Sequence, residues 1–118
     1  MAESRRQKKV AAEVQRAVSE VLQRKGSNFY GSKAFVTVTG TTITPDLLEA
    51  KIYLSVYNLD NPELVINALN QHVHEVKREL GLKMRHQLRR MPELHFLADQ
   101  TAEEAQRIDD LLKGLKDS

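Results

Sequence analysis

Apolar residues recur every three or four positions in the first part of the chain. They form a stripe of Val10, Val14, Ala17, Val18, Val21 and Leu22. Because this spacing places the side chains on one face of a helix, we predict an α-helix over residues 6–25 that ends at Gly26. Residues 26–33 are predicted to form a loop. Its aromatic residues, Phe29 and Tyr30, are expected to pin the loop to the core, with stacking on nucleic-acid bases as the alternative.

Two segments of alternating polarity follow this loop. Residues 34–43 place Val36 and Val38 on one face and threonines on the other, and residues 50–56 alternate in the same way. Such alternation is typical of half-buried strands. Thr44-Pro45-Asp46-Leu47 lies between them and has the residues of a tight turn. We therefore predict a β-hairpin.

A second helical stripe occupies the middle of the chain. It consists of Val65, Leu69, Val73, Val76 and Leu80. Asn61 is predicted to cap this helical region, whose first residue would be Pro62. Periodicity leaves open whether the region is one helix or two, and whether a kink lies at His72-Val73-His74 or near Gly81.

A short strand and a last helix complete the predicted order. Met91-Pro92 ends the helical region, and residues 93–97 alternate as a strand does. Thr101 and Glu104 form a capping-box pattern. The amphipathic helix that follows has the apolar residues Ala105, Ile108, Leu111, Leu112 and Leu115. The order α-β-β-α-α-β, with a C-terminal helix, predicts an α+β fold. Its three-stranded sheet is covered by helices on one face, and its second and third strands are parallel.

Length and composition narrow the classes of protein. The chain has 118 residues, 41% hydrophobic and 29% charged, so we predict one globular domain over residues 1–118. Without cysteine it has neither disulfides nor zinc thiolates. No apolar run approaches the roughly 20 residues that cross a bilayer, and the basic N-terminus leads into no signal-like apolar segment. We therefore expect a cytoplasmic protein that does not contact a membrane.

The positive charges lie in two blocks. Residues 1–25 have seven Lys and Arg against three acidic residues, and residues 77–90 have six against one. A basic block suits a polyanion, while a solvated face or a solubilising arm is the alternative. The predicted nucleic-acid contacts are Arg5, Arg6, Lys8, Lys9, Lys77, Arg78, Gly81, Lys83, Arg85, Arg89 and Arg90.

One strip of the second block has a helical spacing. His74, Arg78, Gly81 and Arg85 are separated by four, three and four residues, so they lie along one side of a helix, beside the apolar stripe. A glycine between two arginines is expected to leave an open gap where a partner's backbone approaches, and the guanidinium groups suit phosphate oxygens.

Signals for catalysis and metal binding are weak. His72 and His74 point to opposite sides of a helix, and His86 and His95 have no Asp or Glu at ligand spacing. Asp109 and the aspartate after it are typical of a solvated helix face. The chain has no phosphate-binding glycine loop and no serine nucleophile motif. We therefore predict no catalytic residue, no metal, no cofactor and no small-molecule substrate.

Several separate segments resemble the ribosome-binding factor A family of bacteria, in the same order. They are Gln7-Lys8-Lys9-Val10-Ala11, Thr44-Pro45-Asp46-Leu47, Ala50-Lys51-Ile52-Tyr53-Leu54-Ser55, Val76-Lys77-Arg78-Glu79-Leu80-Gly81 and Arg89-Arg90-Met91-Pro92-Glu93-Leu94-His95-Phe96. The resemblance covers about residues 7–112. It departs at His72-Val73-His74, where the family commonly has an Ala-x-Gly kink. The acidic C-terminal extension of some relatives is also missing.

The resemblance implies a type II KH-like fold without the usual G-x-x-G loop. It also implies a non-enzymatic assembly factor, most needed in the cold, that binds the immature small ribosomal subunit and its ribosomal RNA and supports late processing of the precursor RNA. We expect a monomer. The alternatives are a generic single-stranded RNA binder, a protein–protein adapter acting through Ile108, Leu111 and Leu115, and, least favoured, a ribonuclease.

Overall fold

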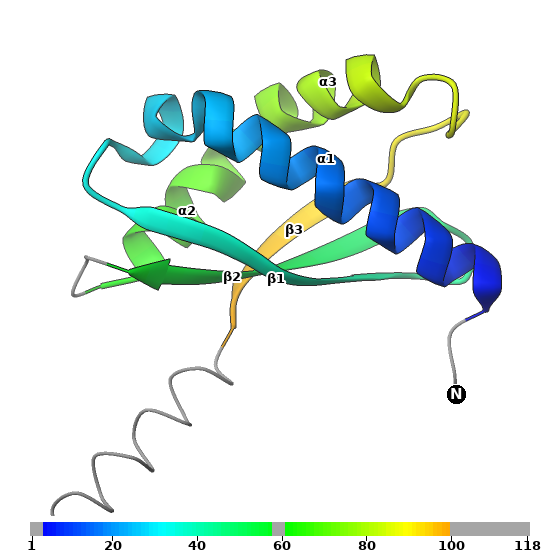
Figure 1. Ribbon diagram of the computed structural model, residues 1–118, viewed down its shortest axis with the longest axis horizontal. Coiled ribbons are helices and arrows are strands. Elements are labelled where there is room, and N and C mark those ends of the chain that lie inside the picture. Colours follow the sequence, from blue (N-terminus) through cyan, green and yellow to red (C-terminus); the bar gives the residue numbers. More distant parts are fainter. Residues whose placement is uncertain (1–3, 58–60, 100–118) are drawn as a thin grey trace, which may run out of the picture.

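The computed structural model describes residues 4–57 and 61–99. Its elements in chain order are α1 (Arg5–Tyr30), β1 (Phe35–Ile43), β2 (Glu49–Tyr57), α2 (Glu63–Gln71), α3 (Val73–Met84) and β3 (Glu93–Ala98). The predicted order is confirmed for these six elements (Figure 1). The predicted last helix, with the apolar residues of the adapter alternative and Asp109, lies outside the described residues.

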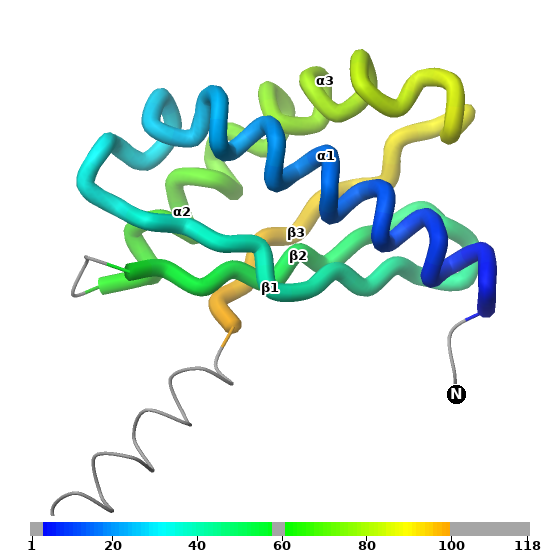
Figure 2. Tube along the Cα trace, in the orientation of Figure 1, coloured from blue at the N-terminus to red at the C-terminus, as the bar shows by residue number. Residues whose placement is uncertain are grey.

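The three strands form one sheet in the order β1-β2-β3. β1 pairs with β2 as an antiparallel hairpin, and β2 pairs with β3 in parallel, with Ala50 opposite Leu94. All three helices lie on the same face of this sheet (Figures 1 and 2). The α+β class and the topology predicted from the sequence are therefore confirmed, and they agree with a type II KH-like fold.

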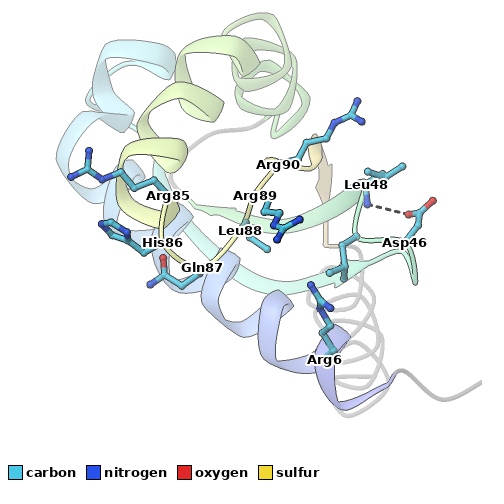
Figure 3. A pocket seen from close by; sticks show the side chains of 10 residues that line it. Arg6, Asp46, Leu48, Arg85, His86, Gln87, Leu88, Arg89 and Arg90 are labelled. Carbon is cyan, nitrogen blue, oxygen red and sulfur yellow. Dashed lines mark hydrogen bonds between the residues drawn. The ribbon is translucent and has the colours of Figure 1, made fainter.

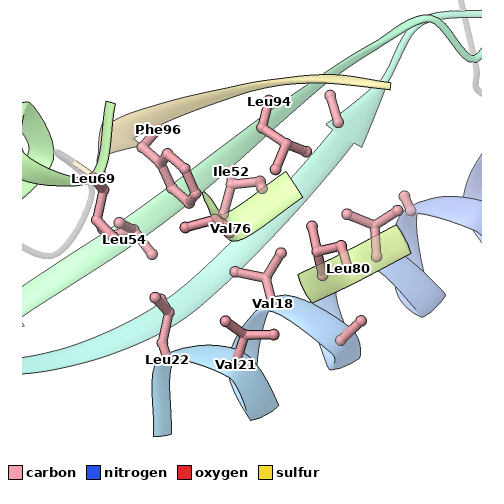
Figure 4. Packing of buried hydrophobic residues seen from close by; sticks show 14 of the residues in the cluster. Val18, Val21, Leu22, Ile52, Leu54, Leu69, Val76, Leu80, Leu94 and Phe96 are labelled. Carbon is pink, nitrogen blue, oxygen red and sulfur yellow. The ribbon is translucent and has the colours of Figure 1, made fainter. Parts of the chain in front are cut away.

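The core lies between this sheet and the helices. Figure 4 shows Val18 of α1, Val76 and Leu80 of α3, and Ile52 and Phe96 of the sheet packed together, and all five are at most 1% exposed. These residues belong to the stripes and alternating segments of the sequence. Burial of that apolar surface is the main force that holds the helices on the sheet.

The first helix is longer than predicted, because Gly26 does not end it. α1 continues to Tyr30, and Gly31, with φ of 88°, follows as its C-terminal cap. A Cβ atom on Gly26 would lie 2.1 Å from the hydroxyl oxygen of Tyr30, one turn further along the helix. The glycine thus makes room for the tyrosine ring. Phe29 and Tyr30 pack against the core, as expected, but from a helix rather than a loop.

The middle helical region is broken at His72, which separates α2 from α3. Gly81 lies inside α3, so the kink is at the first of the two predicted places. Asn61 caps α2 as predicted, since its side-chain oxygen accepts a hydrogen bond from the backbone N–H of Glu63 at 3.1 Å. Asn70 of α2 holds the edge strand, exchanging two hydrogen bonds with the backbone of Phe96 at 3.1 and 3.2 Å.

Candidate nucleic-acid interface

Three segments that are distant in the sequence meet at one end of the molecule. They are the start of α1, the turn between β1 and β2, and the loop between α3 and β3 (Figure 2). The side-chain amide of Gln7 donates a hydrogen bond to the carbonyl of Ile43 at 3.0 Å, which fixes α1 beside the turn. The backbone N–H of Glu93 donates to the carbonyl of Leu48 at 2.8 Å, which fixes the end of the loop to the same turn.

The start of α1 has an unfavourable charge distribution for a helix. Ser4 and Gln7 form a reciprocal capping box, with hydrogen bonds of 3.1 and 2.9 Å. The first turn has no acidic residue, and exposed cations occupy this end of the helix: Arg5, Arg6, Lys8 and Lys9. Cations at a helix N-terminus oppose the helix dipole, whereas an anion there is stabilised by it. The charges therefore favour an anionic ligand more than they favour the isolated helix.

The turn between β1 and β2 is held by hydrogen bonds to Asp46. One of its carboxylate oxygens accepts from the Thr44 hydroxyl at 2.6 Å and from the backbone N–H of Leu48 at 3.0 Å. These hydrogen bonds, that of Thr44 first, lower the pKa of the Asp46 carboxyl. Leu47 has φ of 63°, a left-handed conformation that is strained for a bulky residue.

The loop after α3 begins with one further turn, in which the backbone N–H groups of Gln87 and Leu88 donate to the carbonyl of Met84 at 2.9 and 3.1 Å. Together, the three segments enclose a pocket of about 440 Å³. Its lining residues are Arg6, Asp46, Leu47, Leu48, Arg85, His86, Gln87, Leu88, Arg89 and Arg90. Four guanidinium groups and one carboxylate give the pocket a net positive charge.

The arginines around the pocket do not all point the same way. Figure 3 shows Arg6 and Arg89 turned toward the space between α1 and the loop, while Arg85 and Arg90 extend away on opposite sides. Within residues 4–57 and 61–99, none of the four forms a salt bridge. Cations without internal partners remain free to bind an external anion.

The structure thus brings together one predicted residue from the first basic block, Arg6, with three from the second. The other predicted cations of α1 are exposed but do not line the pocket, and neither does Arg78, which is exposed on α3. Sequence reasoning missed the contribution of the turn, Asp46 to Leu48, and of His86 and Leu88. The turn itself was recognised, but no local pattern in the sequence indicates which distant segment packs beside it.

Two predicted lysines have partners within the chain. The ammonium of Lys77 lies 2.7 Å from the carboxylate of Glu93, and that of Lys83 lies 3.0 Å from Glu20 of α1. The prediction of an open gap at Gly81 is wrong, because this side of the glycine faces the chain's own Met91. A Cβ atom there would be 3.7 Å from Met91 Cγ. The strip along α3 is therefore partly used to hold α3 in place.

The histidines are placed apart from one another. His95 has a carboxylate neighbour that its sequence position did not reveal, since parallel pairing of β2 and β3 brings Glu49 within 3.5 Å of its ring nitrogen. The ring of His72 lies against Phe29, with ring centroids 5.3 Å apart. In the described part of the chain, no three His, Asp or Glu side chains come together as a metal site would need. None of the helices described there is long and apolar enough to cross a membrane.

Comparison with known proteins gives the family. The sequence profile of the family described as Ribosome-binding factor A matches residues 6–112. The chain belongs to the ribosome-binding factor A family. It is 32% identical over 117 residues to the ribosome-binding factor A of Christiangramia forsetii, covering 99% of this chain and 89% of that protein. It is 36% identical to that of Chlorobaculum tepidum, covering 92% and 88%.

Solved structures of the family share the fold. The crystal structure of ribosome-binding factor A from Thermus thermophilus is similar with a TM-score of 0.64 and 22% identity, over 78% of this chain and 94% of that one. A homology model of the Thermus thermophilus factor, fitted into a cryo-EM map of its complex with the 30S subunit, gives a TM-score of 0.62 at 22% identity. That match covers 75% of this chain and 90% of the other. The resemblance stated from the sequence is confirmed.

Proposed function

We propose that this protein binds the immature small ribosomal subunit through its ribosomal RNA and supports late maturation and processing of the precursor RNA. The observation that carries the proposal is the meeting of Arg6 with Arg85, Arg89 and Arg90 around one pocket, without salt bridges among the described residues. A related protein is described in complex with the 30S subunit, which makes this RNA the ligand to test first.

The arginines would act by replacing the counterions of the RNA. A guanidinium binds two phosphate oxygens at once, and each phosphate neutralised releases counterions, so affinity falls as salt rises. The exposed cations Arg5, Lys8, Lys9 and Arg78 would add phosphate contacts beside the pocket. Lys77 and Lys83 would contribute mainly by holding α3.

The finer parts of the proposal follow from the family. We propose that the protein acts as a single-domain monomer in the cytoplasm, without a cofactor, and that it performs no catalytic step of its own. Its contribution would matter most in the cold, when RNA structures rearrange slowly.

Sedimentation with ribosomal particles tests the proposal. The full chain should co-sediment with immature small subunits and not with large subunits, and raising salt should release it. Cells that lack the protein should accumulate precursor small-subunit RNA, most strongly at low temperature. Absence of the protein from the small-subunit fraction at low salt would overturn the proposal.

A pair of matched variants assigns the binding to this site. Arg6→Ala with Arg89→Ala should remove co-sedimentation, because both guanidinium groups point toward the pocket. Arg16→Ala with Arg24→Ala removes the same charge from exposed positions further along α1, roughly 15 and 27 Å from Arg6 at 1.5 Å per residue, and should leave binding intact. Equal losses for the two pairs would show that binding follows net charge rather than the pocket.

A further inference from the structure

The pocket is more than a basic surface. Leu47, Leu48 and Leu88 contribute to its walls, and two of them, Leu47 and Leu88, also pack against the hydrophobic core. A site that only attracted the phosphates of an RNA helix would need neither a cavity nor apolar walls. The volume of about 440 Å³ falls within the roughly 300 to 1,000 Å³ of small-ligand sites.

We infer that the pocket receives a single unpaired nucleotide of the RNA. This inference rests on the proposed function and names the RNA element that the site would recognise. A paired stem is convex, and proteins read it by shape from outside, whereas unpaired bases can be splayed out and bound one at a time. The concave site fits the second kind of ligand.

The orientation of the arginines divides the work between the nucleotide and its neighbours. Arg6 and Arg89 point toward the pocket and can bind the phosphate of the inserted nucleotide, or stack a guanidinium plane on its base. Arg85 and Arg90 extend outward on opposite sides, where the phosphates before and after that nucleotide would pass. A nucleotide within a chain uses both sets of cations, and a free nucleotide uses only the inner one.

The pocket is also built to keep its shape. Its turn is fixed by the hydrogen bonds of Asp46, its helix by the contact of Gln7 with Ile43, and its loop by the contact of Glu93 with Leu48. The positive φ of Leu47 adds local strain at the same place, and such strain persists where the surrounding structure enforces it, often at binding sites. A preformed cavity loses less entropy when a ligand enters.

The test uses the full chain and two RNA hairpins that have 2-aminopurine at the same position. In one hairpin the modified base is a single-nucleotide bulge, and in the other it is paired with uracil. We expect the bulged hairpin to bind about tenfold more tightly by fluorescence anisotropy, and the emission of 2-aminopurine to change on binding only in that hairpin.

Two leucine variants locate the effect. Leu48→Ser changes a pocket residue that is 42% exposed, so the fold should tolerate it, and it should reduce the preference for the bulge to about twofold or less. Leu64→Ser changes an exposed leucine of α2 outside the pocket and should keep the tenfold preference. Equal preferences in the two variants would overturn the assignment to the pocket.

The remaining outcomes separate this inference from the proposed function. Equal affinity of the wild type for both hairpins would overturn the inference, while binding to the small subunit would still support the function. Displacement of the bulged hairpin by adenosine monophosphate at concentrations near the RNA's own Kd would show a site for free nucleotides, and would also overturn it. Failure to bind any RNA or small subunit would overturn both.

Discussion

α3 and the loop that follows it have similar charges and use them differently. Within the described residues, Lys77, Glu79 and Lys83 of α3 all form ion pairs with other elements, at 2.6 to 3.0 Å. The arginines of the loop, Arg85, Arg89 and the residue after it, form none there. A basic segment that looks uniform in sequence is thus divided into a part that fastens a helix and a part that faces a ligand.

The type of cation follows the same division. α3 uses lysines for its ion pairs, each with a compact ammonium that meets one carboxylate. The loop presents arginines, whose planar guanidinium groups bind phosphate oxygens in pairs. Four predictions test this division, beginning with the largest expected effect.

Removing the loop cations should abolish tight RNA binding without unfolding the protein. In the triple variant Arg85→Ala, Arg89→Ala and Arg90→Ala, affinity for small-subunit RNA should fall about a hundredfold or more, since each charged hydrogen bond is worth roughly 1.5 to 3 kcal/mol. The slope of log affinity against log salt should become shallower by about two units. Anisotropy titrations at several salt concentrations measure both. An unchanged slope would show that these arginines do not contact phosphates.

Gly81→Ala separates the two interpretations of the α3 strip. Because the new Cβ would lie 3.7 Å from Met91 Cγ, an ordinary contact, the alanine fits. Alanine is favoured over glycine inside a helix, so the free energy of unfolding should rise by roughly 0.5 to 1 kcal/mol. RNA affinity should stay the same. Loss of affinity with unchanged stability would mean that a partner's backbone does approach this glycine.

Replacing the lysines of α3 should have the opposite pattern to the loop variants. Lys77→Met with Lys83→Met keeps most of the apolar stem of each side chain but removes both ion pairs. The melting temperature should fall by only a few degrees, because partly exposed ion pairs are weak, and RNA affinity should change little. A double-mutant cycle of Lys83→Met with Glu20→Gln would detect the pairing directly. A large loss of RNA affinity at unchanged melting temperature would contradict the division.

The smallest effect concerns pH. The hydrogen bond from Lys25 is the main cause that lowers the pKa of the Glu79 carboxyl in the folded protein, so folding is favoured while that carboxyl is ionised. Its contribution is present above the unfolded pKa of about 4.3 and is lost as the pH falls through the lower folded value. Melting temperatures measured from pH 6 to 3 should therefore decline less steeply in Glu79→Gln than in the wild type. Glu13→Gln serves as control, because Glu13 forms no salt bridge among the described residues. Identical slopes for Glu79→Gln and Glu13→Gln would remove the role of this pair.

Most of the fold could be predicted from local patterns. The stripe from Val10 to Leu22 and the alternation around Val36 and Ile52 identify buried faces, because a side chain's direction follows from its position in a helix or strand. The exception at Gly26 has a specific cause. Glycine commonly ends helices, but here a tyrosine one turn later needs the space, and a local rule contains no information on that contact.

The candidate site was predictable only as a set of charges. The sequence indicates that residues 77–90 have six cations and one acidic residue, but Glu20 and Glu93, which bind two of the lysines, lie outside that segment. Arg6 and Arg89 are 83 positions apart and line the same pocket. Distances of this kind depend on how the elements pack, not on neighbouring residues.

The sequence by itself determined the element order, the buried faces, the α+β class, the family and the two basic blocks. Each of these depends on residue type and spacing along the chain, which local geometry converts directly into direction and burial. Only the tertiary structure decided which cations are free, where the helical region breaks, and that three distant segments enclose one pocket. The reason is that ion pairing and cavity shape depend on atoms a few ångströms apart in space, and the chain path that brings them together is set by the packing of the whole core.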